Sequence, residues 1–167
     1  MATDQTRANF AQNPPPSGAE ARLFLREDEL DRAADLILAA ARTFFKAAEP
    51  SLSRWNLGPA HYRALAAVRR DPDLTISDLL QRLHVRKQSL ARVLNELEAA
   101  GLIERRPSPK DRRARLLRLT SEGATAEREA STALRERLAG VFRAKGPDAV
   151  VAARSVLQAL LQENAAP

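Results

Sequence analysis

The sequence predicts a mainly α-helical fold that carries one small β-hairpin. Aromatic residues are few, with one Trp, one Tyr and five Phe in 167 residues, so aliphatic residues must build the core, and this favours helices. Apolar residues recur at steps of three and four along most of the chain after residue 28. That period gives way to strand-like runs between residues 102 and 119.

The first predicted helix follows a polar N-terminal segment. Residues 1–22 contain Pro14-Pro15-Pro16-Ser17-Gly18 and are too polar to bury a core, so we expect a flexible arm. A wide apolar stripe over residues 28–48 predicts a helix, and Pro50 is expected to stop it.

Three further helices are predicted between residues 59 and 100. The first begins at Gly58-Pro59, because proline is favoured in a first helical turn, and it ends before Asp71-Pro72. Thr75 is an expected N-cap, and Asp78 completes a capping box at the start of a short helix. After a break at His84-Val85, a longer helix runs over residues 86–100.

The longer helix has a well-defined end. Gly101 can adopt the left-handed conformation that closes a helix, and Leu102 can then pack back on Leu97, as in a Schellman motif.

Two short strands, residues 102–106 and 114–119, flank a turn-rich segment and form the hairpin. Thr120 caps a long helix that Gly146-Pro147 interrupts, and a last helix follows.

A short helix, a tight break, a longer helix and a hairpin make up a winged helix-turn-helix, whose second helix enters the major groove of DNA. On the 86–100 helix, leucines and Val93 share one side, and polar or small residues lie opposite. Arg can contact guanine, Gln or Asn can contact adenine, and an Ala methyl can pack on thymine. The candidate DNA-binding residues of this helix are Arg86, Lys87, Gln88, Ser89, Ala91, Arg92 and Asn95.

The positive charge lies in the same region. Residues 84–120 hold ten basic and four acidic side chains, which accounts for the whole net charge of +6. Clustered Lys and Arg favour a polyanion partner, although charge alone fits a solvated loop equally well. Lys110, Arg112 and Arg113 surround Asp111 at the hairpin tip, where arginines can enter the minor groove and Asp111 can orient one of them.

The stretch from Leu57 to Gly123 resembles the MarR family of bacterial regulators. The resemblance is carried by the run of residues 97–105, by Asp111-Arg112-Arg113, and by Leu119-Thr120-Ser121-Glu122-Gly123. It implies a homodimer joined by the first helix and the last two, with Arg113 in the minor groove. It also implies release of DNA by a small aromatic or anionic effector. Residues 57–120 would form the DNA-binding region, and residues 28–48 and 121–164 the helical dimerisation region.

Several function classes are excluded or disfavoured. No cysteine is present, which removes disulfides and thiol chemistry, and His61 and His84 lie in no metal-binding spacing. No nucleotide-binding or nucleophile motif occurs, so we expect no enzymatic activity and no cofactor. No apolar run is long enough to span a bilayer and no signal peptide is recognisable, so we expect a cytoplasmic protein.

Two points stay open from the sequence. Four residues, Phe45, Trp55, His61 and Tyr62, could line a ligand pocket or simply fill the core. The leading hypothesis is a sequence-specific transcription regulator that binds double-stranded DNA as a homodimer. The alternatives are an architectural DNA-binding protein with little sequence preference and a helical module whose basic face meets an acidic protein.

Overall fold

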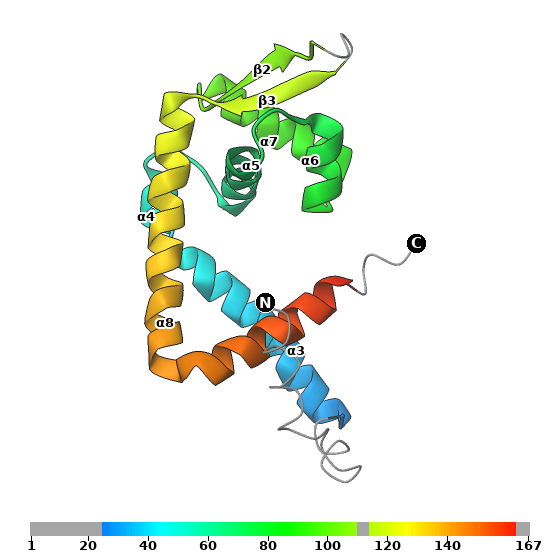
Figure 1. Ribbon diagram of the computed structural model, residues 1–167, viewed down its shortest axis with the longest axis vertical. Coiled ribbons are helices and arrows are strands. Elements are labelled where there is room, and N and C mark those ends of the chain that lie inside the picture. Colours follow the sequence, from blue (N-terminus) through cyan, green and yellow to red (C-terminus); the bar gives the residue numbers. More distant parts are fainter. Residues whose placement is uncertain (1–24, 110–113, 163–167) are drawn as a thin grey trace, which may run out of the picture. The chain divides into compact units, whose positions relative to one another are not determined.

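The computed structural model describes residues 25–109 and 114–162 and divides the chain into two compact units, Met1–Thr43 and Phe44–Pro167. Most of the first unit's described part belongs to α3 (Glu27–Lys46), which ends inside the second unit. The second unit holds α4 (Glu49–Ser53), α5 (Pro59–Arg70), β1 (Leu74–Thr75), α6 (Ile76–Leu83), α7 (Lys87–Ala99), β2 (Ile103–Pro107), β3 (Arg115–Leu119) and α8 (Ser121–Gln162). The mainly α-helical class predicted from the sequence is confirmed (Figure 1).

The core of the second unit lies among α5, α6, α7 and the sheet (Figure 1). It is almost wholly aliphatic, as the scarcity of aromatic residues predicts. Its large members with almost no exposed surface are Leu65, Val68, Leu79, Leu94, Leu97, Leu102 and Leu117. Each fully buried side chain of this size contributes about 1.5–3 kcal/mol to folding, so the buried leucine side of α7 holds that helix in place.

Capping interactions set the helix ends where the sequence predicts them. The Thr75 hydroxyl accepts the Asp78 N–H at 3.1 Å, and the Asp78 carboxylate accepts the Thr75 N–H at 3.1 Å. At the end of α7, Gly101 has φ 69°, its N–H donates to the Glu98 carbonyl, and the Leu102 N–H donates to the Leu97 carbonyl, both at 2.9 Å. The capping box and the Schellman motif are therefore both confirmed.

The sheet has three strands rather than the two of the predicted hairpin. Its order is β1-β3-β2, all antiparallel, and β1 pairs Leu74 with Leu117 and Thr75 with Leu116. The two-residue β1 is too short to show a strand period in the sequence. The ion pair between Asp73 and Arg118 holds β1 beside β3, and the Arg118 hydrogen bond is the main cause of the lowered pKa of Asp73.

Pro50 lies in the first turn of a new helix, α4, instead of only marking the end of the helix before it, which corrects the prediction for this segment. α4 starts at Glu49, so Pro50 lies in its first turn, where the missing N–H costs no hydrogen bond. The turn brings Ala48 and Leu52 against Ala130 and Leu134 of α8, and these four residues form a second buried cluster.

The end of α7 and the start of α8 meet at one joint. The Thr120 hydroxyl donates to the Gly101 carbonyl at 2.7 Å and accepts the Gly123 N–H at 3.0 Å. The Thr120 N–H donates to the Leu102 carbonyl at 3.1 Å. A Cβ at position 123 would lie 1.8 Å from that same carbonyl oxygen, so only glycine fits there.

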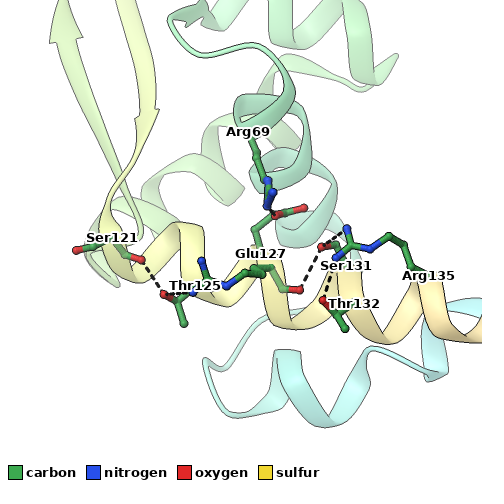
Figure 2. Close-up of polar contacts among 8 residues, drawn as sticks. Arg69, Ser121, Thr125, Glu127, Ser131, Thr132 and Arg135 are labelled. Atoms are coloured by element: carbon green, nitrogen blue, oxygen red, sulfur yellow. Dashed lines mark hydrogen bonds and ion pairs between the residues drawn. The ribbon is translucent and has the colours of Figure 1, made fainter.

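A half-buried ion pair attaches α8 to α5. Arg69 Nη1 lies 2.7 Å from Glu127 Oε2, and the Glu127 residue is only 4% exposed (Figure 2). One turn further along α8, the buried Ser131 hydroxyl accepts a hydrogen bond from Arg135 at 3.0 Å. Beyond Leu134 no described residue of α8 is buried, and Gly146 interrupts the helical backbone with φ 79° and ψ 172°, at the predicted break.

We expect Gly123→Ala to lower the free energy of unfolding by about 1–3 kcal/mol or more, because the methyl group overlaps a backbone carbonyl that cannot move alone. Urea unfolding measures the change. The control is Gly140→Ala in the same helix, where a Cβ meets nothing within 4 Å and the expected effect is a gain of about 0.4–1 kcal/mol. Equal effects of the two substitutions would show that the joint at Gly123 is not tight.

Candidate nucleic-acid interface

The outward side of α7 carries every residue of that helix proposed from the sequence to bind DNA. Leu90, Leu94 and Leu97 are buried on the opposite side, so packing fixes which side faces outward. The seven candidates are all exposed: Arg86, Lys87, Gln88, Ser89, Ala91, Arg92 and Asn95. The helix therefore offers one continuous polar face to a ligand.

The N-terminus of α7 has no side-chain cap. Arg86 is the N-cap residue, with extended backbone angles, and it makes no capping hydrogen bond. The first amide N–H groups and the positive end of the helix dipole are thus available to an anion. Arg86 and Lys87 form no ion pair with any residue in the described ranges, so their charge is also available.

The Nε atom of Arg92 is hydrogen-bonded within α7, whereas most of its side chain is exposed. Its Nε donates to Glu96 Oε1 at 2.8 Å, whereas the side chain is 81% exposed. The other oxygen of Glu96 lies 2.7 Å from Nε2 of His61 on α5. The hydrogen bonds from Arg92 and then from His61 hold the pKa of Glu96 below its ordinary value, so the carboxylate stays ionised at neutral pH.

Asn95 is tied to the sheet. Arg105 of β2 donates from Nη2 to Asn95 Oδ1 at 2.7 Å, and its Nε lies 3.2 Å from Glu98 Oε2 without hydrogen-bond alignment. The contact fixes the Asn95 amide with its nitrogen directed away from Arg105. Asn95 therefore braces α7 against β2 as well as forming part of the outward face.

Carboxylates neutralise much of the basic charge on β2 and β3. Arg106 pairs with Glu104 at 2.6 Å, and Arg118 pairs with Asp73. Arg115 is exposed and pairs with no carboxylate among the residues that the structure describes. The proposed tip residues Lys110, Asp111, Arg112 and Arg113 lie outside the described residues, so their predicted role stays a prediction.

The four aromatic and histidine residues considered for a ligand pocket point to different places. Phe45 and Tyr62 lie edge to face with ring centroids 6.2 Å apart, against the second buried cluster. The Trp55 indole instead donates to Glu129 on α8 at 3.3 Å, and His61 faces α7. Burial raises the pKa of Tyr62, and the nearby Glu127 carboxylate raises it further.

The sequence did not identify the residues that support the outward face of α7. The spacing of Arg92 and Glu96 is that of a helical ion pair and was recognisable. The contacts of His61 and Arg105 with α7 depend on how other elements pack on that helix.

Within residues 25–109 and 114–162, no group of three or more metal-ligating side chains is close enough to hold an ion. In those same ranges, no helix is long and apolar enough to cross a membrane.

Comparison with known proteins gives a consistent result. The profile of the MarR family matches residues 55–114. The HTH-type transcriptional regulator PetP of Rhodobacter capsulatus is 41% identical over 144 residues, which cover 86% of this chain and 87% of PetP. The crystal structure of a MarR family transcription regulator superposes with a TM-score of 0.72 at 25% identity, over 83% of this chain and 91% of that one. The apo form of wild-type MarR from E. coli gives 0.61 at 25% identity, over 77% and 96%.

Proposed function

Because the chain belongs to the MarR family and is a DNA-binding transcription regulator, we propose that it acts as a homodimer on a pseudo-palindromic operator, as a ligand-responsive repressor. The observation that carries this proposal is the continuous exposed polar side of α7, whose opposite side is buried. A helix fixed in this way can present the same side chains to each operator half-site.

The proposed division of labour follows from geometry and charge. Arg92, Gln88 and Ala91 lie on the outward side and would read base edges in the major groove. Arg86 and Lys87 stand at the uncapped helix start and would bind phosphate, as would Arg115 on β3. The tip of the wing, with Arg113 oriented by Asp111, would enter the minor groove.

Exposed apolar surface supports the homodimer. α3 is amphipathic yet buries none of its residues, and the part of α8 beyond Leu134 is equally uncovered. A second copy of the chain offers the same stripes, and their pairing would remove apolar area worth about 25 cal/mol per Å². The large exposed residues of these two segments include Leu30, Leu36, Ile37, Leu38, Leu138, Val141, Phe142, Val151, Leu157, Leu160 and Leu161.

A small aromatic or anionic effector would act by moving helices. The chain has no cysteine and one methionine, Met1, so thiol oxidation is not available as a signal. An effector that binds one arrangement of the helices more tightly than the other would shift the protein toward that arrangement and so change its affinity for the operator. The change can be no larger than the difference between the effector's affinities for the two arrangements. We propose no enzymatic step and no cofactor.

Replacing the two classes of basic residue should give different results in DNA binding. We expect Arg92→Ala to weaken operator binding by about 1–3 kcal/mol and to relax the preference at one position per half-site, because the guanidinium that reads the base is removed. Lys87→Ala should weaken binding to operator and to non-operator DNA by similar amounts, because a phosphate contact carries no sequence information. It should also make the salt dependence shallower by about one unit for each phosphate that is no longer neutralised. Binding titrations over a range of salt concentrations measure both effects.

The wing variants extend the same titrations. Arg113→Ala is expected to resemble Lys87→Ala, and Asp111→Ala to resemble a milder form of it. Full binding by all four variants would mean that α7 and the wing are not the DNA-binding surface. Equal wild-type affinity for all sequences would favour an architectural protein, since an operator should be preferred by at least about a thousandfold.

Light scattering at micromolar concentration should give twice the chain mass of 18.4 kDa. The double variant Val141→Glu/Leu157→Glu should shift the mass toward that of one chain, because both side chains stand exposed on the proposed interface and charge would resist burial there. The control is Arg137→Glu, a charge change at an exposed polar position of the same helix. A monomeric wild type that binds operator tightly would contradict the homodimer.

A further inference from the structure

Three side chains connect the backbone of α5 to the outward side of α7. The Gly58 N–H donates to His61 Nδ1 at 3.0 Å, His61 Nε2 lies 2.7 Å from Glu96 Oε2, and Arg92 Nε donates to Glu96 Oε1 at 2.8 Å. Since Nδ1 accepts a hydrogen bond, the neutral ring carries its proton on Nε2 and donates it to Glu96. The direction of every hydrogen bond in this series is thereby set.

This arrangement divides the guanidinium of Arg92 into two parts. Its Nε is occupied by Glu96, and its two terminal amino groups make no hydrogen bond with the described residues. A bidentate contact with O6 and N7 of guanine needs two N–H groups directed the same way. The terminal amino groups supply them while the pair with Glu96 stays intact.

We propose that Glu96 and His61 are positioning residues that hold Arg92 in its base-reading conformation and so set specificity at one base pair in each half-site. The inference rests on the proposed function, in which Arg92 reads a base edge. Neither Glu96 nor His61 needs to touch DNA. Their effect is to reduce the side-chain entropy that Arg92 loses when it binds.

The contact with α5 distinguishes this arrangement from an ordinary surface ion pair. An isolated Arg–Glu pair four residues apart on a helix leaves both side chains free to rotate and contributes little. Here Glu96 is also held by His61, whose side chain is only 16% exposed and is itself held by the start of α5. The packing of α5 on α7 therefore fixes the position of the Glu96 carboxylate.

The charge of Glu96 adds discrimination. A carboxylate beside Arg92 repels phosphate and weakens any non-specific contact between this arginine and the DNA backbone. Removal of the Glu96 carboxylate should therefore weaken operator binding and leave non-specific binding unchanged or slightly stronger. Damage to the fold would weaken both.

The test uses the full chain and a consensus duplex selected by the wild type from random DNA, together with every single-base-pair variant of that duplex. We expect Glu96→Ala to reduce the preference by roughly three- to tenfold at the position where Arg92→Ala removes it, and at no other position. In an Arg92→Ala background, Glu96→Ala should change nothing further at that position. Glu96→Gln, which keeps the side-chain shape, should give a smaller reduction at the same position.

Two substitutions of His61 form a matched pair. His61→Asn can keep an acceptor for the Gly58 N–H but is too short to reach Glu96, so it should reproduce a part of the Glu96→Ala effect. His61→Gln can keep a donor to Glu96, so it should retain the base preference although the hydrogen bond to Gly58 is removed. Thermal unfolding of each variant separates this difference from a change in stability.

The outcomes distinguish this inference from the proposed function. If Arg92→Ala removes the preference and neither Glu96→Ala nor His61→Asn changes it, the positioning role is wrong and the proposed function stands. If Arg92→Ala leaves every base preference intact, Arg92 reads no base and the positioning role is also overturned. A wild type that selects no consensus overturns both.

Discussion

The joint between the end of α7 and the start of α8 is the constraint on which the rest of the second unit depends. The Thr120 hydroxyl donates to the Gly101 carbonyl, just after α7, and accepts the Gly123 N–H in the first turn of α8. Because Gly123 has no side chain, α8 can approach the Leu102 backbone closely. The direction of α7 and the start of α8 are therefore fixed at one point. The position of the sheet follows, because β2 begins and β3 ends beside this joint.

The same joint relates the outward side of α7 to the buried side of α8. Glu127 and Ala130 lie on the first turns of α8 after the joint, where they meet Arg69 of α5 and the second buried cluster. A movement of α8 would thus displace α5. Because His61 lies on α5, it would also displace the Glu96 carboxylate on α7. In the proposed regulator, this is a physical route by which a change in the helical dimerisation region could reach the base-reading residues.

Local signals predicted most of the fold, and long-range contacts account for what was missed. The capping box at Thr75 and the left-handed Gly101 depend on neighbours in the sequence, so both helix ends were predictable. β1 exists only because Leu117 pairs with it across more than forty residues. Pro50 obeys a local rule that allows a helix to end or to begin, and packing on α8 selects the second.

The candidate site divides in the same way. The outward residues of α7 were predictable from the helical period, because burial of one side determines the other. The contacts of His61 and Arg105 with α7 were not predictable, because they join residues on different elements. The spacing of Arg92 and Glu96 indicated an ion pair. That His61 of α5 also contacts the Glu96 carboxylate is visible only in the folded structure.

Selection of bound fragments from random DNA by the full chain tests the proposed mode of DNA binding most directly. Two identical α7 helices related by two-fold symmetry would contact one face of the duplex. We therefore expect an enriched motif with two inverted half-sites whose centres lie about one helical turn apart, roughly 10 base pairs. Recovery of a single asymmetric site, or of no motif under conditions where the protein binds DNA, would contradict this mode of binding.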